Sequence, residues 1–97
     1  MKLLGNMTIN NQELAIAGHG ARELVEKYGS PLYVIDQEDL LARIQTFVTN
    51  FVSDQFKTNV IYASKAFTNL YMAQLVSKQG LSMDVVSGGE LYTAVEA

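Results

Sequence analysis

The sequence contains no cysteine, one histidine and one proline among its 97 residues. The absence of cysteine excludes disulfide bonds and thiolate metal sites, and it fits a reducing compartment. With His19 as the sole imidazole, the chain holds no histidine pair for a metal and no Ser-His-Asp set. No apolar run approaches the roughly 18 residues of a membrane span, and Met1–Asn6 lacks the apolar core of a signal peptide. We therefore expect a cytoplasmic protein.

Basic residues are also few, because seven lysines and arginines stand against ten aspartates and glutamates, for a net charge of −3. No basic run or patch is present, which argues against a nucleic-acid partner. With this net charge, an anionic cofactor would depend on backbone N–H groups rather than on a positive field. The chain also lacks the glycine fingerprint of a dinucleotide site. Hydrophobic residues make up 48% and charged residues 18%, which is typical of one small globular domain.

The first 30 residues predict short strands followed by one helix. Residues 7–9 and 14–16 are β-type runs joined by the turn signal Asn10-Asn11. Apolar residues recur at helical spacing over Ala21–Tyr28, and Gly29 ends that helix. An isolated hairpin is marginal in water, so these strands need a further surface on which to pack.

From residue 32 onward the pattern alternates between strand and helix. The expected strands are Leu32–Ile35, Val60–Ala63 and Leu81–Val86, and the expected helices start at Asp36, at Thr68 or Asn69, and at Ser87. Strands joined in turn by single helices indicate a parallel sheet with right-handed crossovers. We therefore predict an α/β fold that comprises the first three βα units of a (β/α)8 TIM-type barrel. Since a closed barrel needs on the order of 250 residues, we expect this chain to be the front part of a longer protein.

Lys65 follows the second of these strands, in the segment Ile61–Ala66. Chemistry collects at the carboxyl ends of strands in βα-repeat folds. A desolvated lysine amine at that end can form a Schiff base with a carbonyl or with pyridoxal phosphate. The small neighbours Ala63, Ser64 and Ala66 leave room for a planar cofactor. A lysine that ends a strand is more often a solvated surface residue, and spacing alone favours that alternative.

Asp84 interrupts the apolar run of the third strand. A carboxylate inside a barrel is costly unless it is paired or hydrogen-bonded. It either points inward beside Lys65, where it can orient the lysine or interact with a cofactor ring, or it faces the helix layer or water. The pattern leaves both open. Ser87–Glu90 has capping-box spacing, and its two glycines also offer backbone N–H groups to an anion, but capping is the favoured explanation.

Three stretches resemble diaminopimelate decarboxylase, a family within the fold-type III, alanine-racemase-like pyridoxal phosphate enzymes. Tyr28–Val34 is similar to the start of the family's first barrel strand, Tyr62–Ala66 to its cofactor-lysine motif, and Asp84–Leu91 to its third strand and helix. The resemblance runs from about residue 7 to the end of the chain. Phe67 departs from it, because many members have asparagine at that position, and a polar contact there is in doubt.

The resemblance implies that Lys65 is the catalytic residue and holds pyridoxal 5′-phosphate as a Schiff base, with Ala63 and Asp84 near the cofactor and no metal. It implies that residues 1–30 are strands and a helix that belong to, or lead into, a separate β-domain. Residues 31–97 would then be a truncated cofactor-binding barrel. The remaining active-site groups would lie outside this chain.

The implied function is the decarboxylation of meso-2,6-diaminopimelate to L-lysine, in lysine biosynthesis, by a homodimer of the full-length protein. The 97-residue chain alone is expected to be inactive. One alternative is another fold-type III decarboxylase or racemase that acts on ornithine, arginine or alanine. A second is a non-catalytic pyridoxal-phosphate-binding barrel protein.

Overall fold

The computed structural model describes residues 2–97, which form two units, one extending to Arg43 and the other from Ile44 to Ala97. The strands are β1 (Met7–Asn10), β2 (Glu13–Ile16), β3 (His19–Gly20), β4 (Ile61–Ala63) and β5 (Ser82–Asp84). The helices are α1 (Ala21–Tyr28), α2 (Gln37–Asn50), the 3-10 turn η1 (Ser64–Ala66), α3 (Leu70–Lys78) and α4 (Gly88–Glu96). No helix within residues 2–97 is both long enough and apolar enough to cross a membrane.

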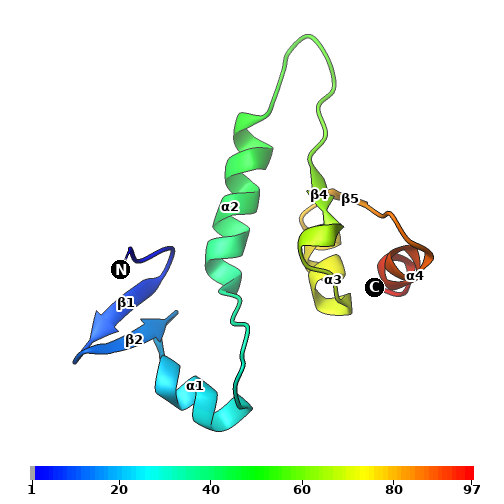
Figure 1. The fold of residues 1–97 in the computed structure, drawn as a ribbon. Helices are drawn as coiled ribbons and strands as arrows, with labels where there is room; N and C mark the ends of the chain where they lie inside the picture. Colours follow the sequence, from blue (N-terminus) through cyan, green and yellow to red (C-terminus); the bar gives the residue numbers. More distant parts are fainter. Residues whose placement is uncertain (1) are drawn as a thin grey trace. The chain divides into compact units, whose positions relative to one another are not determined.

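The N-terminal unit contains an antiparallel meander of β1, β2 and β3, followed by α1 (Figure 1). Met7 is paired with Ile16 and Asn10 with Glu13. The turn between the two strands is formed by Asn11 and Gln12, whose φ angles are 49° and 63°. Positive φ at both central residues matches the right-handed twist of a two-residue hairpin. The predicted pair of strands is confirmed, with its turn one residue later than expected.

The predicted limits of α1 and the predicted start of α2 are also confirmed. α1 stops at Tyr28, and Gly29 adopts a φ of 86° that favours glycine. α2 begins after Asp36, whose Oδ1 accepts hydrogen bonds from the N–H groups of Glu38 and Asp39 at 3.0 and 3.2 Å. This side chain satisfies two of the N–H groups that a helix start leaves without a partner.

The predicted strand Leu32–Ile35 is absent from the structure, in which this segment pairs with no strand of residues 2–97. The side chain of Tyr33 is 96% exposed. A strand requires hydrogen bonds to a neighbour as well as an apolar sequence, and a continuous apolar run requires cover on both faces. Within residues 2–97, Leu32–Ile35 has neither a neighbouring strand nor cover on both faces. The fold is therefore a mixed α/β structure with small sheets, and the first of the three predicted βα units lacks its strand.

The C-terminal unit contains the parallel pair β4 and β5, with α3 as the connection between them (Figure 1). Both strands are shorter than predicted. β4 begins at Ile61 instead of Val60, and β5 stops at Asp84, before Val85 and Val86. α3 supplies most of the core, and its buried residues are Met72, Ala73, Leu75 and Val76. Its start is capped by Asn69, whose side chain accepts the N–H of Met72 at 2.8 Å. α3 packs against both β5 and α4.

Candidate functional site

The carboxyl ends of β4 and β5 lie side by side and bring together the residues that the sequence singled out (Figure 1). Ala63 and Asp84 are register partners at the last position of each strand. Lys65 lies two positions after Ala63, in η1, the turn that leads from β4 toward α3. β4 and β5, which are separated by α3 in the chain, thus place the carboxylate of Asp84 and the turn that carries the Lys65 amine at the same end of the parallel strand pair. The roles of these three residues toward a cofactor remain predictions.

Asp84 holds the turn through its backbone. Its Oδ1 accepts a hydrogen bond from the N–H of Ser64 at 2.8 Å. The side chain of Asp84 is itself exposed, so the carboxylate stays accessible to water. Of the two alternatives left open by the sequence, the structure shows Asp84 at the strand end and hydrogen-bonded across to the residue before Lys65. The cost of a carboxylate in an apolar strand is met by this bond and by hydration.

Lys65 is exposed and forms no salt bridge with any carboxylate of residues 2–97. Ala63, which precedes the turn, is exposed as well and carries only a methyl group. The neighbouring Ser64, the first residue of the turn, is 1% exposed. An uncommitted amine is therefore carried by an exposed residue that directly follows a buried one, Ser64, in the same turn.

Two hydroxyl groups close the turn from either side, and sequence reasoning missed both. The hydroxyl of Tyr62 donates to the carbonyl of Phe67 at 2.7 Å. The hydroxyl of Thr68 donates to the carbonyl of Ser64. Burial raises the pKa of Tyr62 above its usual value of 10.0, and its hydrogen bond with the Phe67 backbone opposes part of that rise. A signal was available, because hydroxyl residues lie three positions before and three positions after Lys65.

The glycine segment before α4 has the predicted capping role. Ser87 Oγ accepts the N–H of Glu90 at 3.2 Å, and Glu90 Oε2 accepts the N–H groups of Val86 and Ser87 at 2.6 and 3.1 Å. These reciprocal bonds form a complete capping box. Because the Glu90 carboxylate already occupies this helix start, capping accounts for the segment without an added anion.

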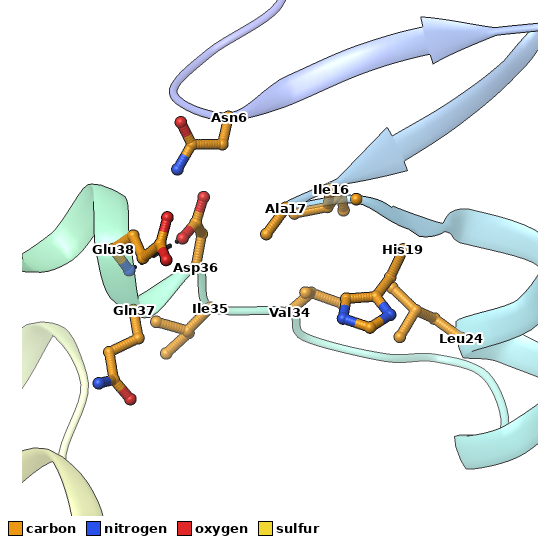
Figure 2. A pocket seen from close by; sticks show the side chains of 11 residues that line it. Asn6, Ile16, Ala17, His19, Leu24, Val34, Ile35, Asp36, Gln37 and Glu38 are labelled. Carbon is orange, nitrogen blue, oxygen red and sulfur yellow. Dashed lines mark hydrogen bonds between the residues drawn. The ribbon is translucent and has the colours of Figure 1, made fainter.

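The N-terminal unit contains a separate cavity of about 530 Å³, between the end of β2, α1 and the start of α2 (Figure 2). His19 and Asp36 line it together with apolar side chains such as Ile16 and Val34. Oδ2 of Asp36 is buried without a hydrogen-bond partner in the part of the chain that the structure describes. None of Ala63, Lys65 and Asp84 lines this cavity. Residues 2–97 contain no group of three or more potential ligands that could hold a metal ion.

Residues 37–97, more than half of the chain, match the family model described as "Pyridoxal-dependent decarboxylase, pyridoxal binding domain". The chain belongs to this family. The matched range includes all three predicted site residues, although the match does not assign them roles. The predicted family is confirmed, and with it, at the level of the family, the predictions of an enzyme and of pyridoxal phosphate as its cofactor.

Individual relatives are named as diaminopimelate decarboxylases. The chain is 54% identical over 84 residues to the Bacillus subtilis protein, covering 87% of this chain and 19% of that one. It is 47% identical over 94 residues to the Bacillus methanolicus protein, covering 96% of this chain and 22% of the relative. The crystal structure of the M. jannaschii enzyme superposes with a TM-score of 0.84 at 37% identity, covering 94% of this chain and 22% of that one. The chain thus spans about a fifth of the length of the relatives it matches.

The site residues fit the cofactor of the decarboxylase family. A pyridoxal aldehyde requires a primary amine that is accessible and not committed to a salt bridge, and Lys65 meets both conditions within residues 2–97. The methyl side chain of Ala63 leaves space beside the amine for a flat ring. Asp84 places a negative charge at the same edge, where it can face a protonated group.

Proposed function

We propose that this chain is part of a pyridoxal-phosphate-dependent decarboxylase that converts meso-2,6-diaminopimelate to L-lysine. The observation that carries the proposal is the position of Lys65, an uncommitted amine at the carboxyl edge of a parallel strand pair, beside Ala63 and Asp84. The choice of substrate is supported by the similarity to diaminopimelate decarboxylases at 54% and 47% identity. A neighbouring structure of the M. jannaschii enzyme is described as a complex with L-lysine, which agrees with the proposed product.

In this proposal Lys65 is the covalent attachment point. Its Nζ would hold the cofactor through a carbon–nitrogen bond to the aldehyde carbon, with the aldehyde oxygen released as water. When bound, the cofactor supplies an electron sink for the pair of electrons that remains after carbon dioxide departs. Asp84 holds the turn that presents Lys65, through its bond to the N–H of Ser64. Lys65 would also be able to hold or deliver a proton at Nζ.

We also propose the organisation of the full-length protein. Residues 1–30 would belong to or lead into a β-domain, and residues 31–97 would form the first three βα units of the barrel. Leu32–Ile35 would become a strand there, once a neighbouring strand supplies its hydrogen bonds. Large exposed apolar side chains support additional cover over both units; they include Tyr33, Phe47, Phe51, Val86 and Val95. A homodimer, a cytoplasmic location and inactivity of the isolated 97 residues complete the proposal.

The test uses the full-length protein and measures carbon dioxide release from diaminopimelate, ornithine and arginine. The variants are Lys65→Ala and, as a matched control, Lys57→Ala, which removes an exposed lysine from the loop before β4. We expect release from diaminopimelate alone, its loss in Lys65→Ala, and no change in Lys57→Ala. Borohydride reduction followed by peptide mass spectrometry should find the pyridoxyl group on Lys65.

Other outcomes separate the alternatives. Release from ornithine or arginine instead of diaminopimelate would assign a different fold-type III decarboxylase. Attachment at Lys65 without release from any substrate would favour the non-catalytic binding protein. A pyridoxyl group on a different lysine would reject the role of Lys65. Turnover by the isolated 97-residue chain would reject the view that residues outside it are essential.

A further inference from the structure

The turn that carries Lys65 is too short to fix its own conformation. η1 comprises only Ser64, Lys65 and Ala66, and a single 3-10 turn contains few internal hydrogen bonds of modest geometry. The backbone leaves this turn at once, because Phe67 is extended, with a φ of −166° and a ψ of 124°. The direction of the Lys65 side chain must therefore be set by bonds from outside the turn.

Two side-chain hydroxyls supply such bonds without touching Lys65 itself. Tyr62, in β4, donates to the carbonyl of Phe67 at 2.7 Å and so links β4 to the residue after the turn. Thr68 donates to the carbonyl of Ser64, at the first position of the turn. Lys65 lies within both of the chain segments that these bonds close, residues 62–67 and residues 64–68. The Tyr62 hydroxyl is protonated across the neutral range at its ordinary pKa of 10.0, so it is available as a donor, and burial raises that pKa further.

These bonds act on different backbone groups from the one that Asp84 binds. Asp84 accepts the N–H of Ser64 and ties the turn to β5. Tyr62 and Thr68 bind carbonyl groups and tie the turn to the segments next to it in the chain. Loss of either hydroxyl would leave the attachment to β5 in place while allowing the peptide units around Lys65 to rotate. An amine at the end of four methylenes is displaced strongly by such a rotation.

We infer that Tyr62 and Thr68 are positioning residues that hold the turn in the conformation that presents the amine of Lys65 to an aldehyde. This inference rests on the proposed function of Lys65 as the attachment point. Neither residue needs to contact the cofactor or the substrate. Their effect should appear in how fast Lys65 reacts with the aldehyde and in how rigid the turn is before any cofactor has bound.

The experiment compares four variants of the cofactor-free full-length protein. Tyr62→Phe and Thr68→Val each remove one hydroxyl and keep the shape of the side chain. Thr68→Ser keeps a hydroxyl at this position and should therefore show none of the effect of Thr68→Val. Tyr92→Phe is the matched control, because it removes a hydroxyl from an exposed side chain of α4. Circular dichroism confirms that each variant is folded.

Two measurements are made on every protein. The first is hydrogen exchange of the amides of residues 64–68 before the cofactor is added. The second is the rate at which added pyridoxal phosphate becomes fixed to Lys65, measured by borohydride quenching and peptide mass spectrometry. A neutral hydrogen bond contributes about 0.5–1.5 kcal/mol, so Tyr62→Phe and Thr68→Val should each exchange about two- to tenfold faster and attach the cofactor slower by a similar factor. Thr68→Ser and Tyr92→Phe should behave like the wild type.

The outcomes distinguish this inference from the proposed function. If the wild-type protein does not attach the cofactor at Lys65, the proposed function is wrong, and the inference falls with it. If all proteins attach it at Lys65 with one rate, the proposed function stands and the positioning role is wrong. Faster exchange in Tyr62→Phe and Thr68→Val without slower attachment would likewise overturn the inference, because the hydroxyls would then only stabilise the turn.

Discussion

Replacement of Asp84 tests the link between β5 and the turn that carries Lys65. In Asp84→Ala the N–H of Ser64 loses the carboxylate oxygen that accepts it at 2.8 Å. Ser64 is 1% exposed, so water has little access to the freed N–H group. In Asp84→Asn an amide oxygen can occupy the same position, and the bond is retained without its charge. The two variants therefore separate the hydrogen bond from the negative charge.

The size of the effect follows from the kind of bond. A hydrogen bond to a charged acceptor contributes about 1.5–3 kcal/mol and a neutral one about 1 kcal/mol. Because the Asp84 side chain is exposed, we take the lower end, about 1.5 kcal/mol, for its complete loss. That value corresponds to roughly a tenfold change in an equilibrium constant, and the roughly 0.5 kcal/mol lost in Asp84→Asn to about twofold.

The assay is hydrogen exchange of the Ser64 amide in the full-length protein. We expect about tenfold faster exchange in Asp84→Ala and about twofold in Asp84→Asn. The control is Asp54→Asn, which removes an exposed carboxylate from the loop before β4 and should leave Ser64 unchanged. Unchanged exchange at Ser64 in a folded Asp84→Ala protein would refute the reasoning, since the bond would then not hold the turn.

Three further predictions concern the helices and Tyr62. Ser87→Ala removes the capping box of α4 and should lower the free energy of unfolding by about 1 kcal/mol, as measured by urea denaturation. The control is Ser77→Ala, at an exposed position of α3, and an equal loss in that variant would contradict capping as the cause. Met72→Ala leaves a cavity at a side chain that is 4% exposed and should cost about 2–5 kcal/mol, whereas the exposed Gln74→Ala should leave thermal melting nearly unchanged. Because the folded state raises the pKa of Tyr62 above 10.0, the stabilisation linked to its protonated form is complete below the unfolded pKa and is lost as the pH rises through the folded one. Ultraviolet titration should show the Tyr62 hydroxyl ionising at a higher pH than an ordinary tyrosine. Tyr62→Phe should abolish the fall in stability that accompanies this ionisation. An identical fall in stability with pH in both proteins would show the assignment to be mistaken.

Much of the local structure was predictable from residues within a few positions of each feature. Asp36 was predicted to cap α2 and Ser87 to cap α4, and both accept the expected helical N–H groups. Gly29 was predicted to end α1 and does so with a positive φ. These features depend on short-range stereochemistry and on hydrogen bonds between near neighbours, which the order of the residues already specifies.

The candidate site was predictable in its residues but not in its contacts. Lys65 and Asp84 could be singled out because βα alternation predicts that the ends of successive parallel strands meet, whereas Ala63 was taken from the family resemblance. The bond from the N–H of Ser64 to Asp84 could not be chosen, because the sequence left two orientations of that carboxylate open. Tyr62 and Thr68 were overlooked because a hydroxyl at a strand or loop position has many possible partners.

Leu32–Ile35 shows the limit most clearly. Its composition is that of a buried strand, yet it is unpaired within residues 2–97. The sequence by itself specified the helix limits, the hairpin and the amine at a strand end, since these arise within short stretches of chain. Only the tertiary structure decided the register of β4 and β5, the lack of a partner for Leu32–Ile35 within residues 2–97, and what Asp84 binds, because the register Ala63 to Asp84 joins residues that are distant in the chain. Such pairings depend on surfaces that lie outside any one segment.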